Sequence, residues 1–132
     1  MEFFKTLELQ TSEKEIQTLL TLENLDTYSN ELFPLKKVEF DKAQIGGIWG
    51  EFTLTLHPIA GGVRFALQEC PNALTWTVTA GFPPEKGKVI IHLTVNRKER
   101  EKEFVQEIQE FMDDLATGLV KTLVDDKVSL IE

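Results

Sequence analysis

Cysteine is almost absent from this chain of 132 residues, in which Cys70 is the only one. A single thiol cannot form an intramolecular disulfide, so the sequence favours a cytoplasmic setting over a secreted one. Long apolar runs are absent too, and none approaches the roughly 18 residues of a membrane-spanning helix. The N-terminus, MEFFKTLELQ, carries Glu2 and Glu8 where a signal peptide would have an apolar core.

Positive charge is scarce. The chain has 14 Lys and Arg against 22 Asp and Glu, which gives a formal net charge of −8. Neutralising phosphates requires clustered basic side chains, so we predict no nucleic-acid partner. The same imbalance opposes docking on anionic membranes, and we predict no membrane partner either. The acidic residues gather toward the two ends of the chain, as is typical of solvated helix faces.

Groups that carry out chemistry are few and scattered. The two histidines, His57 and His92, both fall on the expected polar face, and no local spacing assembles three metal ligands. Cys70 has no histidine near it in sequence. The neighbours Asp113 and Asp114 would diverge by about 100° on a helix, which makes a poor acid–base pair. We therefore predict no metal and no cofactor, and the sequence leans away from an enzyme.

Alternating apolar and polar residues predict six strands. The clearest pattern is LTWTVTA, in which Leu74, Trp76 and Val78 share one side and the threonines the other. The expected strands cover residues 3–9, 35–41, 47–57, 62–69, 73–80 and 88–96. Gly- and Pro-rich connectors such as HPIAGG and GFPPEKG are short, so neighbouring strands should pair as an antiparallel meander.

Two helices are expected beside this sheet. Ser12 followed by Glu15 is a capping box, which predicts a short helix over residues 13–23. Asn96 with Glu99 is a second N-terminal signal, for a long helix over residues 98–124. Its apolar stripe consists of Phe104, Ile108, Phe111, Leu115 and Leu119. Gly118 lies on the same side as the stripe. Glycine in a helix interior costs ~1 kcal/mol relative to alanine, so we expect a compensating close approach of the helix backbone to the sheet at this residue.

These elements fit one domain over residues 1–132, with an α+β fold in two layers. An antiparallel meander of about six strands would pack its apolar face on the long C-terminal helix and the short N-terminal helix, with the threonine face in water. The element order resembles the helix-grip fold of the START and polyketide-cyclase superfamily. The stretches QIGGIWGEF and QECPNALTWTV look like segments of its Hsp90-activator-like branch.

Bulky residues at expected inward positions suggest a candidate site. They are Phe40, Phe52, Phe65, Trp76, Ile91, Phe111 and Leu115. One interpretation is a plain core, and the other is a cavity between sheet and long helix that holds a small hydrophobic ligand. Trp49 is expected on the opposite face, where a tryptophan can anchor a protein partner.

The function favoured by this pattern is a small soluble, non-catalytic binding domain for a small hydrophobic molecule. The alternative is a protein-interaction or chaperone-like domain that uses the outer sheet face around Trp49, acting as a homodimer. An enzyme working in the same cavity is less favoured, because no titratable group is expected inside it.

Overall fold

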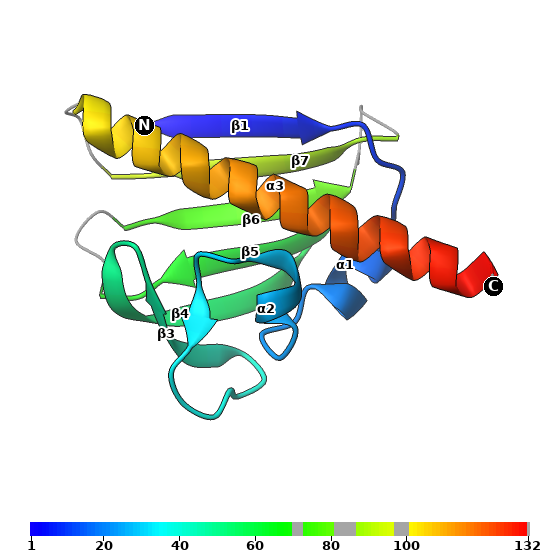
Figure 1. The fold of residues 1–132 in the computed structure, drawn as a ribbon, viewed down its shortest axis with the longest axis horizontal. Helices are drawn as coiled ribbons and strands as arrows, with labels where there is room; N and C mark the ends of the chain where they lie inside the picture. Colours follow the sequence, from blue (N-terminus) through cyan, green and yellow to red (C-terminus); the bar gives the residue numbers. More distant parts are fainter. Residues whose placement is uncertain (70–72, 81–86, 97–100, 132) are drawn as a thin grey trace.

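The computed structural model describes residues 1–69, 73–80, 87–96 and 101–131 (Figure 1). The strands are β1 (Glu2–Leu7), β2 (Phe33–Pro34), β3 (Lys42–Gly47), β4 (Gly50–Ile59), β5 (Gly62–Leu67), β6 (Thr75–Ala80) and β7 (Val89–Thr94). The helices are α1 (Glu13–Leu19), α2 (Leu25–Tyr28) and α3 (Lys102–Ile131).

Within these ranges the strands form one antiparallel sheet in the order β1-β7-β6-β5-β4-β3-β2. The meander predicted from the short connectors is confirmed from β3 to β7. The first strand then pairs with the last, with Phe3 opposite Leu93 and Lys5 opposite Ile91. Figure 1 shows α3 running diagonally across the sheet from the β1 side toward α1. The result is the predicted α+β arrangement of a sheet packed on a long C-terminal helix.

The alternation that defined β6 and β7 is confirmed by burial. Leu74, Trp76 and Val78 are buried, whereas the threonines between them are half-exposed. In β7, Val89, Ile91 and Leu93 are fully buried. Apolar residues of the two strands therefore share the inner face, against which the helices pack.

The strand predicted over residues 35–41 is wrong. The backbone N–H of Leu35 still reaches Gln44 O, but Glu39 N donates to Lys42 O at 3.0 Å, so the chain turns back within this segment. Phe40, expected inward, is 86% exposed. Only two residues, Val38 and Phe40, supported the alternation there, and a turn projects such a pair outward as readily as a strand projects it inward.

The single strand predicted over residues 47–57 is also wrong at its start. Gly47 pairs with Gly50, so Ile48 and Trp49 form the two-residue turn of a hairpin between β3 and β4. Gly50 has φ +118°, a backbone conformation that suits glycine. The hairpin adds β3, and the described sheet has seven strands where about six were expected.

The N-terminal helix begins where the sequence predicted. Ser12 Oγ accepts from Glu15 N at 3.1 Å, but the Glu15 carboxylate accepts from Thr11 Oγ1 at 2.7 Å. The helix ends at Leu19 and not near residue 23, and α2 supplies a separate turn. The helix predicted over residues 13–23 is therefore too long at its end, and α2 is a further helical turn of the kind that the stretch LDTYSNELF suggested.

The long helix buries its predicted stripe, including Ile108, Phe111 and Leu119. Its expected start and the Glu99 signal lie outside the described residues, and it extends past the predicted end at residue 124. The close approach predicted at Gly118 is present, but the neighbour is not the sheet. A Cβ at Gly118 would lie 2.2 Å from Tyr28 O. At Gly118, therefore, α3 packs closely against the backbone of α2 and not against the sheet.

Candidate functional site

Five of the seven predicted ligand-binding residues lie together beneath α3. They are Phe65, Trp76, Ile91, Phe111 and Leu115, and each is at most 2% exposed. Phe65 stacks on Trp76 with ring centroids 5.3 Å apart, and Trp76 meets Phe111 edge-on at 5.1 Å. These are favourable aromatic geometries, and the rings pack between the sheet and the helix.

One polar atom inside this aromatic cluster has no partner. Trp76 Nε1 is buried and finds no hydrogen-bond acceptor among the described residues. A buried indole N–H normally has one, since leaving a donor unsatisfied costs about 1–3 kcal/mol. It is the donor that a polar atom entering the cluster would meet.

Tyr28 continues the aromatic contacts toward α2, with its ring centroid 6.1 Å from that of Phe65. Its hydroxyl donates to Thr21 O at 2.7 Å. Burial, with a smaller contribution from the Glu23 carboxylate, raises the pKa of Tyr28 far above its usual value. Tyr28 therefore stays neutral at any physiological pH and serves as a structural donor.

A pocket of about 220 Å³ lies at the α1 end of the same inner face. Its apolar lining comes from Phe40, Leu56, Pro58 and Val63, and its polar lining from Gln17, Thr21 and Glu23. Phe40 thus belongs to a pocket, although it does not point inward as the sequence predicted. The pocket brings together α1, the segment before β3, and the adjoining strands β4 and β5.

The position of α1 over this pocket is set by polar contacts with the β4–β5 hairpin. Gln17 Nε2 donates to Ile59 O at 3.2 Å and to Gly62 O at 3.0 Å. One turn earlier, the Glu13 carboxylate accepts from Gly61 N at 2.8 Å. Both donor hydrogens of the Gln17 amide are therefore used within the protein, and its Oε1 atom, with Thr21 and Glu23, supplies the polar lining of the pocket.

Two predicted site residues remain: Phe52, expected to bind the ligand, and Trp49, expected to bind a protein partner. Phe52 is half-buried on β4, where it packs against the margin of the core, and it does not line the α1 pocket. The expected outward position of Trp49 is wrong, because its ring packs on Phe111 at 5.3 Å and its Nε1 donates to Glu107 Oε2 at 2.8 Å. The hairpin turn folds Trp49 onto α3, so the outer sheet face lacks this anchor.

The ionisable groups are dispersed. His57 on β4 and His92 on β7 are separated by two strands, and His92 Nε2 lies 3.0 Å from Glu2 Oε1. The described ranges contain no group of three His, Cys, Asp or Glu that could hold a metal ion. Cys70 lies outside the described residues. No helix within the described part of the chain is long and apolar enough to cross a bilayer.

One carboxyl group stands out at the α2–α3 contact. Burial, followed by the nearby Asp114 and Glu110 carboxylates, raises the pKa of Glu31. Asp114 Oδ2 in turn accepts from Asn30 N at 3.0 Å and from Glu31 N at 3.3 Å. Asp114 therefore ties the segment before β2 to α3, at the cost of repelling the ionised form of Glu31.

Sequence reasoning missed most of the α1 pocket. Leu56 and Val63 were expected on the inner face, but nothing distinguished them from other core residues. Gln17, Thr21 and Glu23 follow the capping signal of α1, and their meeting with Phe40 depends on tertiary packing. The only early signal was an apolar Phe40 in a polar segment.

No protein-family model matches this chain, and a search of curated proteins gave no match. Among solved structures, the fold is similar to that of a START superfamily protein from Mycobacterium smegmatis, with a TM-score of 0.63 at 15% identity. The match covers 94% of this chain and 97% of that one. The resemblance to the START superfamily that the element order suggested is therefore confirmed at the level of the fold.

Proposed function

We propose that this chain, with its START-type helix-grip fold, is a binding domain for a small hydrophobic molecule. The observation that carries the proposal is the α1 pocket, in which four apolar side chains face three polar ones. Ligand sites in proteins are typically concave and mostly apolar, with a few polar groups that fix orientation. The similarity in fold to a START superfamily protein adds support to the proposal of a binding domain.

The lining constrains the ligand. Phe40, Leu56 and Val63 suit an apolar body, while the Glu23 carboxylate accepts but does not donate hydrogen bonds. The favoured ligand therefore has a hydroxyl, amine or other donor at one end. At about 220 Å³ the pocket is smaller than the ~300–1,000 Å³ that drug-sized ligands occupy, so the ligand is small.

The proposed role is non-catalytic. Of the residues that line the pocket, Glu23 is the only one with an acidic or basic side chain, so the Thr21 hydroxyl has no second group beside Glu23 to complete an acid–base pair. Acid–base catalysis generally needs such a partner within hydrogen-bond reach.

A matched pair of tryptophan substitutions tests the proposal. Leu56→Trp fills the pocket, whereas His57→Trp adds the same bulk to the next residue, which is exposed on β4. Small apolar alcohols and amines, with the corresponding carboxylates, would be titrated into each variant by calorimetry. We expect saturable binding of a donor-bearing compound to the parent and His57→Trp chains, and at least tenfold weaker binding to Leu56→Trp.

A second measurement locates the ligand. Trp49→Phe leaves Trp76 as the sole tryptophan, because the chain has two. A ligand in the α1 pocket should leave Trp76 emission nearly unchanged, whereas one entering the aromatic cluster beneath α3 should alter it strongly. Absence of saturable binding by any compound, or equal binding by Leu56→Trp, would contradict the proposal.

A further inference from the structure

The two edges of the sheet differ in what they offer to another strand. At one edge β2 has only two residues, and one of them, Pro34, has no backbone N–H. At the other edge β1 has six residues, EFFKTL, without proline. Short strands and prolines protect an edge from pairing, and β1 has neither protection.

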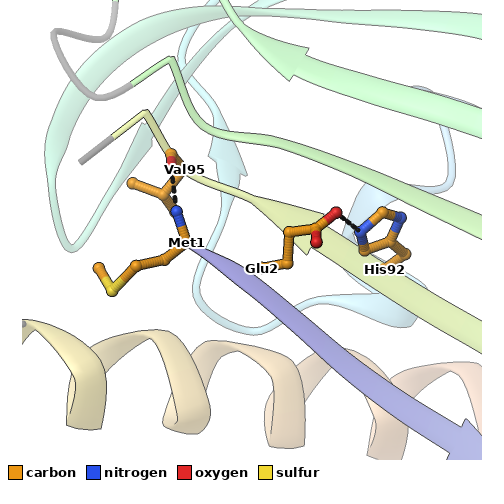
Figure 2. A network of polar contacts seen from close by, with 4 residues as sticks. All are labelled: Met1, Glu2, His92 and Val95. Carbon is orange, nitrogen blue, oxygen red and sulfur yellow. Dashed lines mark hydrogen bonds and ion pairs between the residues drawn. The ribbon is translucent and has the colours of Figure 1, made fainter. Parts of the chain in front are cut away.

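The register of β1 shows which backbone groups face outward. Met1 N donates to Val95 O at 2.8 Å (Figure 2). Val95 N donates in return to Met1 O at 2.9 Å, so the two residues exchange both backbone hydrogen bonds. Because antiparallel pairs alternate, Phe3 and Lys5 repeat this bonded pattern toward β7. The N–H and C=O groups of Glu2, Phe4 and Thr6 therefore point to the open side of β1.

We propose that β1 is a homodimer interface, in which the β1 strands of two copies pair antiparallel about a two-fold axis at Phe4. In this register Phe4 lies opposite Phe4 of the second copy, and Glu2 lies opposite its Thr6. All three outward-facing residues then exchange both backbone hydrogen bonds with the other copy. The two sheets become one continuous sheet, with both α3 helices on the same side.

Charge selects this register over its neighbours. Moving the axis to Lys5 would set two lysines directly opposite each other, which destabilises a strand pair. Moving it to Phe3 would leave Thr6 without a partner in the other β1. With the axis at Phe4, each Lys5 lies opposite Phe3 of the other copy, and no like charges are directly opposite.

The side chains around the axis are suited to contact. Phe4 is 64% exposed, and its ring stacks flat on His92 with centroids 4.2 Å apart. Pairing at Phe4 would extend this stack into a row of four rings across the outer face. The Lys5 ammonium group turns inward to Asp113 on α3, so its charge does not obstruct the edge.

The long helix leaves the edge accessible. In Figure 1, β1 forms the outermost strand, and α3 crosses the sheet away from it after its first turns. One strand pair buries less than the ~1,200–2,000 Å² of a standard interface, so we expect reversible association with a dissociation constant on the order of 10–100 μM.

Sedimentation equilibrium of the full chain over a concentration series tests the interface. Phe4→Lys and Phe4→Glu each place like charges on the axis, and each variant alone should weaken association at least tenfold. Mixed in equal amounts, the two variants should associate, because opposite charges then meet on the axis. Phe33→Lys, at a residue 51% exposed on β2 at the opposite edge of the sheet, is the control and should dimerise as the parent does.

A backbone variant tests the hydrogen bonds separately. Thr6→Pro removes an N–H that points away from β7, so the β1–β7 ladder and the circular dichroism spectrum should be kept while association is lost. A parent chain that stays monomeric at about ten times the expected dissociation constant would overturn the proposal. So would dimers that persist in both Phe4→Lys and Thr6→Pro.

Discussion

The inner face of the sheet has a tightly packed half beneath α3, here called the closed half, and an open half beneath α1 that leaves a pocket. Beneath α3, the rings of Phe65, Trp76 and Phe111 touch one another, and each is at most 1% exposed. Beneath α1, a helix of seven residues, the same face leaves a pocket of about 220 Å³ beside Phe40. The long helix covers the central strands and leaves pockets at its margin, beside Phe3 and Gln109. The short helix leaves the α1 pocket at its own margin.

This difference separates stability from binding. The closed half buries large side chains and should hold most of the folding free energy, at roughly 25 cal/mol per Å² of apolar surface. The open half contributes less to stability and is accessible to a small molecule. Substitutions in the two halves should therefore have opposite profiles, and four of them test this in order of expected effect on stability.

The largest effect is expected in the closed half. Phe111→Ala removes a fully buried ring that contacts both Trp76 and Trp49, and it should destabilise by about 3–5 kcal/mol. Urea denaturation measures this directly. The matched control is Phe52→Ala, at a half-buried site outside the cluster, which should cost much less. Equal losses in the free energy of unfolding at the two sites would show that the closed half does not hold most of the stability.

The next effect is expected where α3 meets α2, between the two halves. Gly118→Ala places a methyl group 2.2 Å from Tyr28 O, so the two helices must move apart, at a cost of about 1–3 kcal/mol. Thr117→Ala, at the exposed neighbouring residue, should change stability by less than ~0.5 kcal/mol. An unchanged melting temperature for Gly118→Ala would show that this contact does not limit the helix packing.

A smaller effect, dependent on pH, is expected at Glu31 on the same boundary. Because the folded state raises the pKa of Glu31, its ionised form is disfavoured there, and its contribution to stability falls as pH rises through that pKa. Glu31→Gln should therefore raise the free energy of unfolding at pH 7, by less than ~1 kcal/mol since the groups are partly solvated, and thermal unfolding measures this gain. The advantage should vanish below pH ~4, where the parent carboxyl is protonated. A gain that is equal at both pH values would have another cause.

The smallest effect on stability is expected in the open half. Phe40→Ala removes a side chain that is 86% exposed, so unfolding should change by less than ~0.5 kcal/mol. Affinity for the small apolar ligand should nevertheless fall, because Phe40 lines the pocket. Phe33→Ala is the control, since this exposed ring contacts Gly46 and is not part of the lining. Equal ligand affinity in the two variants would show that Phe40 does not contribute to ligand binding.

The closed half could be predicted from the sequence because its signals are local. The period of two in β6 and β7 identified Trp76 and Ile91 as inward residues, and the stripe of α3 identified Phe111 and Leu115. Each pattern repeats over several residues, so the loss of one position does not change the phase.

The open half could not be predicted, because its structure depends on turns and distant contacts. The pair Val38 and Phe40 mimicked a strand, and the Gly47–Gly50 hairpin reversed the chain within an apparently continuous alternation. That reversal put Trp49 on α3, where it bonds Glu107, 58 residues later in sequence. The pocket itself combines residues 17–23, 40 and 56–63, which no local pattern connects.

The pairing of β1 with β7 has a consequence for how the chain is made. Glu2 pairs with Thr94 and Leu7 with Val89, so β1, which is synthesised before every other strand of this sheet, is among the last to find its partner. During the synthesis of some eighty residues, EFFKTL stays without its neighbour, while β3, β4, β5 and β6 can pair in sequence. Contacts of such long separation slow folding, and completion of this sheet therefore awaits the emergence of β7.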